Sequence, residues 1–140
     1  MDKKNCPESF LHYFTFNEIM LTDVKIRLED KPGTLAALGE ALGKDGINIE
    51  GLCGPSEQEG ISRILVDNAS SARSALEKAN IEVIEENDVL VLDVEDKPGE
   101  LGRICRRIAD AGVNIDFFYA ATKTRVVLGV SDIEKTKSAL

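Results

Sequence analysis

The chain has 140 residues and a formal net charge of −8, because 25 Asp and Glu residues outnumber 17 Lys and Arg residues. Nucleic-acid binding depends mainly on clustered Lys and Arg, so this acidic balance excludes a phosphate backbone as an expected partner. Hydrophobic residues make up 43% of the chain, as in an ordinary globular protein, and the single histidine, His12, excludes a metal motif built on two histidines.

Residues 1–22 are predicted to be an N-terminal extension that precedes the folded part of the chain. An apolar stretch, 10–16, follows Lys3 and Lys4, but polar residues interrupt it and no small-residue cleavage site follows, so we do not expect a secretory signal. No run approaches the roughly 20 apolar residues that a membrane span needs. Four of the seven aromatic residues lie in this extension, and we expect them either to cover an open sheet edge or to belong to a poorly ordered tail: Phe10, Tyr13, Phe14 and Phe16.

Residues 23–87 have the pattern of one complete α+β unit. Residues 24–29 alternate apolar and charged side chains, which is typical of a strand with one solvated face. The sequence Asp-Lys-Pro-Gly at 30–33 predicts a turn, and Leu35, Leu38 and Leu42 then recur at a helical spacing that predicts a packed face. Further strands are expected at 47–53, 61–67 and 81–86, with a second helix at 69–79.

Residues 88–140 repeat this pattern 66 positions later. The Asp-Lys-Pro-Gly turn recurs at 96–99, and Gly-Ile-Asn-Ile-Glu at 46–50 recurs as Gly-Val-Asn-Ile-Asp at 112–116. Gly46 and Gly112 are placed where a helix would end in the left-handed conformation. Strands are expected at 90–95, 113–119 and 125–130, a helix carries the stripe Leu101, Ile104, Cys105 and Ile108, and Ser-Asp-Ile-Glu from Ser131 matches a capping box for the last helix.

The order β-α-β-β-α-β predicts two ferredoxin-like units, each with its helices on one face of an antiparallel sheet. The second unit has no counterpart of the fourth strand. No flexible linker separates the units, because 85–88 is too short and too closely flanked by strands. A unit of this size buries only about 60% of its unfolded surface, so we expect the two units to pack side by side, edge to edge as one extended sheet.

The three cysteines, Cys6, Cys53 and Cys105, form no C-x-x-C pair. Neither a zinc ribbon nor a thioredoxin-like motif can therefore be built locally, and we expect no metal site. An odd number of widely spaced cysteines fits a reduced, cytoplasmic protein. Cys105 lies on the packed stripe of its helix and is expected to be a small core residue.

The two Asp-Lys-Pro-Gly loops are the most informative chemical feature of the sequence. Gly33 and Gly99 lack a Cβ, so a ligand can approach their backbone, and each lies at a helix start, where free N–H groups and the helix dipole attract a carboxylate. Asp30 and Asp96 are acceptors suited to an ammonium group. This combination is complementary to a zwitterionic α-amino acid. In the alternative interpretation the loop is only a tight turn in which Asp caps the helix and Pro fixes φ.

Two strands that end in Asp-Lys-Pro-Gly-x-Leu, each with a helix leading to Gly-[Ile/Val]-Asn-Ile, resemble two ACT domains, the small modules that bind amino acids and regulate metabolic enzymes. The resemblance covers about residues 23–140. It implies the ferredoxin-like fold, side-by-side pairing of units and amino-acid binding where units pair, and it implies no cofactor.

By position, the resemblance places ligand contacts in both loops and on two asparagines: Asp30, Lys31, Pro32, Gly33, Thr34, Leu35 and Asn48, then Asp96, Pro98, Gly99, Leu101 and Asn114. It implies that Asp30 contacts the ligand ammonium group and that the asparagines reach the ligand from a neighbouring unit; alternatively, the asparagines satisfy backbone groups at a strand start.

Two departures from the family pattern narrow these expectations. Leu28 and Val94 stand where serine-binding members carry a histidine, so serine is not expected to be the ligand. Glu100 places a negative charge near the expected carboxylate site of the second loop. The first loop, which has Thr34 at the matching position, is therefore the better candidate.

We expect a non-catalytic, amino-acid-binding regulatory protein of amino-acid metabolism that forms a homodimer of four ACT units. One alternative is a regulatory subunit of a separate biosynthetic enzyme, because 46–52 and 61–63 are similar to the small regulatory subunit of acetolactate synthase. Another is an interaction module that uses a sheet edge and binds no ligand. An enzyme is least expected, because the loops lack the arginine of a ferredoxin-like acylphosphatase and the C-x-x-C of a metal chaperone.

Overall fold

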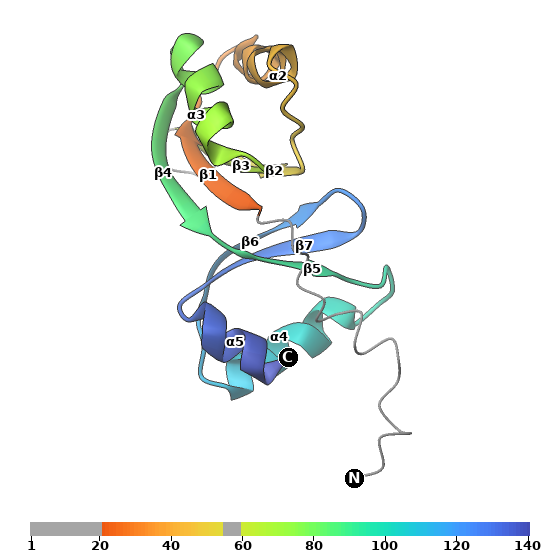
Figure 1. The fold of residues 1–140 in the computed structure, drawn as a ribbon. Helices are drawn as coiled ribbons and strands as arrows, with labels where there is room; N and C mark the ends of the chain where they lie inside the picture. Colours follow the sequence, from red (N-terminus) through yellow and green to blue (C-terminus); the bar gives the residue numbers. More distant parts are fainter. Residues whose placement is uncertain (1–20, 55–59) are drawn as a thin grey trace. The chain divides into compact units, whose positions relative to one another are not determined.

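The computed structural model describes residues 21–54 and 60–140, and these residues form two compact units (Figure 1). The first unit ends at Val89 and the second begins at Leu90. The expectations that concern Phe10, Tyr13, Phe14 and Phe16 lie outside the described residues. None of the helices in the described part is long and apolar enough to span a bilayer.

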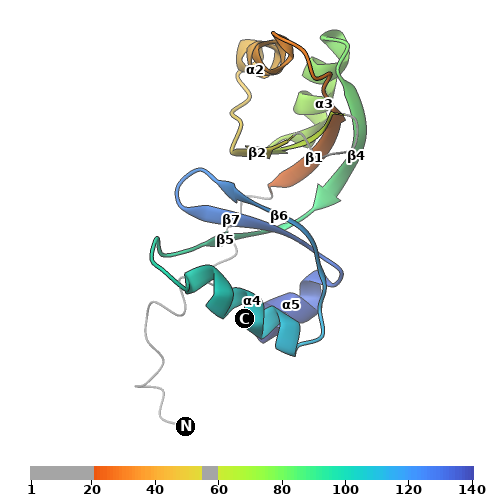
Figure 2. The same ribbon diagram turned by 180° about the vertical axis from the view of Figure 1, so that it is seen from behind.

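The first unit is a four-stranded antiparallel sheet with two helices on one face (Figures 1 and 2). Its strands lie side by side in the order β4-β1-β3-β2. In chain order the elements are β1 (Thr22–Arg27), α2 (Thr34–Lys44), β2 (Gly51–Cys53), β3 (Ile61–Val66), α3 (Ala69–Lys78) and β4 (Glu82–Asp88).

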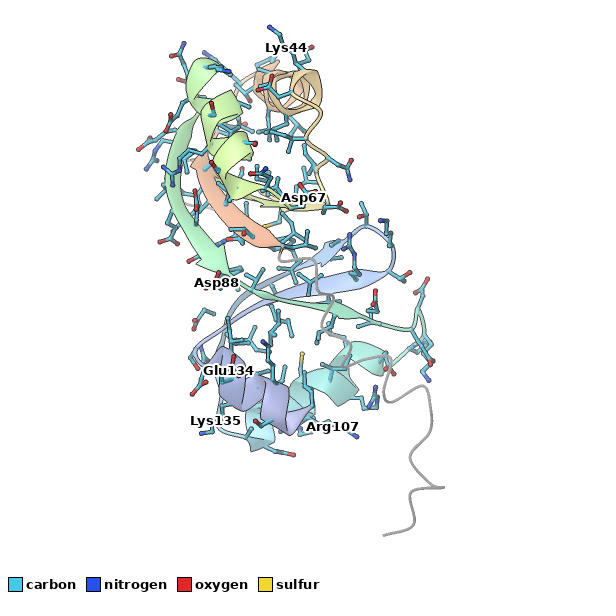
Figure 3. The ribbon with its side chains drawn as sticks, viewed as in Figure 1. Lys44, Asp67, Asp88, Arg107, Glu134 and Lys135 are labelled. Carbon is cyan, nitrogen blue, oxygen red and sulfur yellow. The ribbon has the colours of Figure 1, made fainter. Side chains whose placement is uncertain are left out.

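Alternation along the strands places the core of the first unit between the sheet and its helices. Val24 and Ile26 of β1 and Ile64 of β3 are fully buried in one cluster with Leu38 and Leu42 of α2. The three strand residues point their side chains toward the helices, because successive residues of a strand face opposite sides of the sheet. Charged helix residues lie on the outside, as Lys44 shows (Figure 3).

The second unit has three antiparallel strands in the order β6-β7-β5 and two helices. Its elements are β5 (Leu90–Asp93), α4 (Glu100–Asp110), β6 (Ile115–Ala121), β7 (Arg125–Val130) and α5 (Ile133–Ala139). A separate core cluster gathers Leu90, Leu92, Ile104, Ile108 and Leu128. No strand follows α5 within residues 90–140. The predicted α+β class with antiparallel sheets is confirmed.

Both long helices end in the predicted left-handed glycine. The Gly46 N–H donates to the Gly43 carbonyl (3.0 Å), and the Ile47 N–H donates to the Leu42 carbonyl (2.9 Å). Gly112 and Val113 make the same two bonds behind α4. This is the double hydrogen-bond pattern of a Schellman motif, which satisfies carbonyls that a helix end leaves unpaired.

Several local predictions were wrong in their details. The strand expected at 47–53 is only β2, because the Ile47 amide is used to end α2, and β1 lies two residues earlier than the expected 24–29. Leu35 and Leu101 belong to the predicted helix stripes, but their side chains are 60% and 48% exposed. Each lies in the first turn of its helix, beyond the reach of the core.

The capping box predicted at Ser131 is also wrong. The N-cap of α5 is Asp132, whose side chain accepts a hydrogen bond from the Lys135 N–H (3.0 Å). Ser131 is instead hydrogen-bonded to the segment that leads into β6: its hydroxyl oxygen accepts a hydrogen bond from the Asn114 N–H (3.1 Å). Glu134 and Lys135 are exposed on the outside of α5 (Figure 3).

Candidate functional site

A hollow opens in the first unit where the loop between β1 and α2 meets the ends of β2 and β3 that face it. Its volume is about 370 Å³, which lies at the lower end of the roughly 300–1,000 Å³ typical of ligand pockets. The loop contributes residues 28–31 and 33–35, and the opposite wall comes from residues 52–54 and 62–64. Of the predicted first-loop residues, Asp30, Lys31, Gly33, Thr34 and Leu35 therefore border one concave site.

Gly33 keeps the start of α2 open. It is the N-cap of the helix at φ +91°, and a Cβ built on it would meet no atom within 4 Å. Gly99 is the N-cap of α4 at φ +86° with equally open surroundings. A side chain would be strained at these φ values, so glycine both permits the turn and leaves the helix start approachable.

Neither loop aspartate caps its helix, so the cap that the alternative interpretation assigned to Asp is wrong. No side chain makes a cap hydrogen bond at the start of α2 or α4. The Thr34 hydroxyl donates to the carbonyls of Glu29 (2.7 Å) and Lys31 (3.1 Å), which braces the turn from inside. Among the described residues, no group accepts from the amides of Leu35 and Ala36 in the first turn. Such amides can bind an anion.

The loop carries two acidic residues, Glu29 and Asp30, and among the described residues only Glu29 has an ion-pair partner. Lys31 Nζ lies 2.7 Å from Glu29 Oε2, and this hydrogen-bonded pair lowers the pKa of Glu29 and raises the pKa of Lys31. Asp30 is exposed beside them, and no residue in the described part of the chain forms an ion pair or hydrogen bond with its carboxylate. A negative side chain therefore stands next to the positive end of α2.

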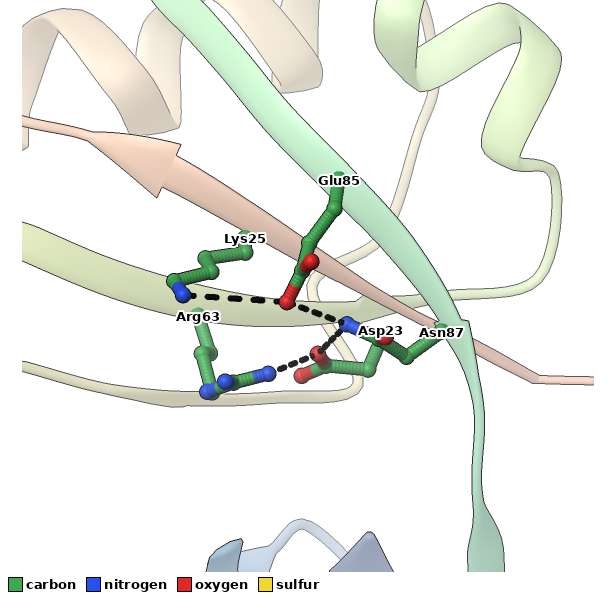
Figure 4. Close-up of polar contacts among 5 residues, drawn as sticks. All are labelled: Asp23, Lys25, Arg63, Glu85 and Asn87. Carbon is green, nitrogen blue, oxygen red and sulfur yellow. Dashed lines mark hydrogen bonds and ion pairs between the residues drawn. The ribbon is translucent and has the colours of Figure 1, made fainter.

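On the opposite wall of the hollow, the positive charge of Arg63 is balanced by the buried carboxylate of Asp23. Arg63 Nη1 donates to Asp23 Oδ2 (2.6 Å), and Asn87 Nδ2 donates to the same oxygen (3.2 Å) (Figure 4). Lys25 and Glu85 extend this network at 3.7 Å. Asp23 is fully buried, and a buried carboxylate requires such partners.

Ser62 and Cys53 complete that wall. Ser62 is only 8% exposed and lines the hollow, and its hydroxyl faces Gly54 so closely that a Cβ there would overlap it. Cys53 is a free thiol, and burial, followed by the negative charge of Asp23, raises its pKa. No group of acidic, cysteine and histidine side chains in the described part could hold a metal ion.

The second loop differs from the first at its helix start. Glu100 stands where the first loop has Thr34, and its carboxylate is only 5% exposed. Arg103 Nη2 donates to Glu100 Oε1 (2.6 Å), and this hydrogen bond is the main reason why the pKa of Glu100 is lowered. The α4 start thus carries an ionised carboxylate of its own, whereas Asp96, Pro98, Gly99 and Leu101 are exposed around it.

The predicted asparagine of the first unit does not line the hollow, and the predicted asparagine of the second unit is hydrogen-bonded within its own unit. Asn48 is exposed between α2 and β2. The Asn114 N–H and carbonyl pair with Ser131, and its Nδ2 donates to Asp116 Oδ1 (2.7 Å). Sequence reasoning missed Leu52, Cys53 and Ser62, because only the pairing of β2 with β3 brings these residues opposite the loop.

Comparison with known proteins identifies the second unit most directly. Residues 89–140 match the ACT domain family. Protein BT0572 from Bacteroides thetaiotaomicron has a similar structure, with 28% identity, a TM-score of 0.75 and an alignment that covers 87% of each chain. No curated protein is similar to the chain at a significant level.

Two regulatory subunits share the fold over most of their length. The aspartate kinase regulatory subunit from Thermus thermophilus, in its ligand-free form, is 23% identical with a TM-score of 0.62, covering 88% of this chain and 89% of that one. The corresponding subunit from Thermus flavus is 21% identical with a TM-score of 0.63, covering 87% and 91%. Residues 89–140 thus match the ACT domain family, and the described chain shares the fold of these regulatory subunits.

Proposed function

We propose that this chain is a non-catalytic regulatory protein that binds an α-amino acid in the hollow of the first unit, and that the first unit is itself an ACT domain. The observation that carries the proposal is the open start of α2, where the amides of Leu35 and Ala36 and the nearby carboxylate of Asp30 have no partner among the described residues. The ACT match of 89–140 supports it, because both units share the same loop, the same glycine N-cap and the same helix end.

The groups around the hollow are complementary to an amino-acid zwitterion. The carboxylate of the ligand would accept hydrogen bonds from the amides of Leu35 and Ala36, where the helix dipole also favours negative charge. The ammonium group would lie against Asp30. Neither contact requires an internal pair to break, because the Glu29–Lys31 and Arg63–Asp23 pairs remain intact.

The same reasoning assigns ligand binding to the first loop rather than the second. At the start of α4 the ionised Glu100 already supplies the negative charge that a ligand carboxylate would bring. A second carboxylate there would compete with Glu100 for the same cationic partners, Arg103 and Lys97, and two like charges close together destabilise one another. Thr34 leaves the corresponding place at α2 uncharged.

A regulatory subunit of a separate enzyme is the second candidate, because the chain aligns with 89% and 91% of two aspartate kinase regulatory subunits. In that case ligand binding would be relayed to a catalytic polypeptide. Both candidates include pairing of two chains, which rests on the resemblance of the sequence to ACT proteins, and a cytoplasmic location, which rests on the odd number of widely spaced cysteines.

A thermal-unfolding screen of the twenty amino acids tests the proposal. A ligand present at 100 times its dissociation constant adds about 2.7 kcal/mol to the free energy of unfolding. Gly33→Val should abolish the increase, since a side chain would fill the approach to α2. Gly99→Val is the matched control, because it introduces the same backbone strain into the second loop and should leave the ligand response intact. The absence of a shift with every amino acid would refute the proposal.

The regulatory-subunit candidate has its own test. A tagged chain should co-purify with a larger enzyme from a cell extract and should change the feedback inhibition of that enzyme. If the chain binds an amino acid but neither co-purifies with an enzyme nor alters one, it acts as a sensor without a catalytic partner.

A further inference from the structure

We infer that the amino acid bound in this hollow has an uncharged, aliphatic side chain; this rests on the proposed function and specifies its ligand. The inference depends on two features of the lining: which charges there are already balanced, and which apolar side chains remain exposed.

The charged groups that border the hollow leave no partner for a charged ligand side chain. Glu29 is paired with Lys31 at 2.7 Å, and Arg63 is paired with Asp23 at 2.6 Å. Among the described lining residues, this leaves Asp30 as the acid whose carboxylate has no ion-pair partner. The ammonium group of the ligand would pair with this carboxylate. A lysine or glutamate side chain would enter the hollow without a counter-ion, and burying an unpaired charge is costly.

The rest of the lining is aliphatic. Leu28 and Leu38 border the hollow on the loop side, and Ile64 borders it on the sheet side. Leu35 is 60% exposed and Leu52 is 48% exposed, and both border the hollow as well. An aliphatic ligand side chain that covered these two leucines would remove apolar surface from water on both partners, which favours binding.

Ser62 marks the inner wall as a place for a polar group of the ligand. The residue is only 8% exposed and lines the hollow. A serine hydroxyl can both donate and accept a hydrogen bond, so it suits an ammonium or a carboxylate group of the ligand. Polar contacts thus gather around the backbone groups of the ligand, and apolar contacts around its side chain.

Titration calorimetry with six L-amino acids tests this inference. Leucine, isoleucine and valine should bind, and lysine, aspartate and glutamate should bind at least about tenfold more weakly, a difference of about 1.4 kcal/mol. Tighter binding of any charged amino acid would overturn the aliphatic assignment while leaving amino-acid sensing in place. If none of the twenty amino acids shifts the thermal unfolding and none of the six binds in calorimetry, the proposed function itself is refuted.

Variants at Leu35 provide a second, independent readout. Leu35→Asn should weaken leucine binding about tenfold, which is a typical effect of losing apolar contact in a ligand pocket. Leu101→Asn is the matched control on an exposed leucine in the second loop and should have no effect. Leu35→Glu should shift the preference toward lysine by giving its ammonium group a partner. If Leu35→Asn leaves leucine affinity unchanged, or if both asparagine variants weaken it equally, the apolar wall does not select the ligand.

Discussion

At the scale of single residues, one position distinguishes the two loops. Both loops have the sequence Asp-Lys-Pro-Gly and a glycine N-cap, yet Thr34 follows one glycine and Glu100 follows the other. The Thr34 hydroxyl is turned inward to two carbonyls of its own loop, whereas the Glu100 carboxylate is held by Arg103. A neutral side chain and an ionised one thus occupy equivalent helix starts.

Exchange of these residues should exchange the behaviour of the loops. Thr34→Glu should abolish amino-acid binding in calorimetry, because the new carboxylate repels that of the ligand. Thr34→Val is the control that removes the hydroxyl without adding charge, and it should retain most of the affinity. Glu100→Thr should raise the number of amino acids bound per chain from one to two. Wild-type protein that already binds two per chain would contradict the assigned role of Glu100.

At the scale of secondary-structure elements, a polar network ties together three strands of the first unit. Asp23 of β1, Arg63 of β3 and Asn87 of β4 meet on the sheet face opposite to the helices (Figure 4). Asp23 is completely buried, whereas the Arg63 side chain retains some exposure to water. The two partners are therefore not equivalent: the acid depends on the pair more than the base does.

Removal of each partner should reveal this asymmetry. Arg63→Ala takes the 2.6 Å guanidinium partner from a buried carboxylate and should lower the free energy of unfolding by about 3 kcal/mol. Asp23→Ala should cost less, because Arg63 can turn to water. Lys25→Met, which breaks a partly exposed ion pair on the same face, should change stability by less than about 1 kcal/mol. Urea unfolding without ligand measures all three, and equal losses for Arg63→Ala and Lys25→Met would contradict the burial argument.

At the scale of the whole molecule, two units that share the order β-α-β-β-α have different roles in the proposal. The first unit has the complete four-stranded sheet and the hollow beside its loop. The second matches the ACT family but has a carboxylate of its own at the start of α4. In the proposal the chain thus combines one unit that binds a ligand with one in which the Glu100 carboxylate disfavours a ligand carboxylate at the helix start.

Each unit contains a half-buried free cysteine that can report where the ligand binds. Cys53 lines the hollow, whereas Cys105 lies on α4, and burial raises the pKa of both thiols. Both should therefore react slowly with iodoacetamide at pH 8, because the thiolate is the reactive form. Saturating leucine should slow alkylation of Cys53 and leave Cys105 unchanged, as followed by peptide mass spectrometry. Protection of Cys105 alone would place the ligand in the wrong unit.

The local pattern of the sequence was sufficient to predict the class of fold and the candidate loop. Alternation and helical spacing depend on neighbouring residues, so most strands and helices could be placed within a few residues. The glycines at 33, 46, 99 and 112 take positive φ values where α2 and α4 start and stop. These conformational requirements are local, so a short stretch of sequence is sufficient to predict them.

Only the tertiary structure decided which side chains surround the candidate site. Leu35 fits a helical stripe, yet it borders the hollow because the first turn of α2 extends past the core. Ser62 and Cys53 face the loop only because β2 pairs with β3, and the partner of Asp23 lies forty residues away in the chain. These contacts depend on how distant elements pack, so no local periodicity encodes them.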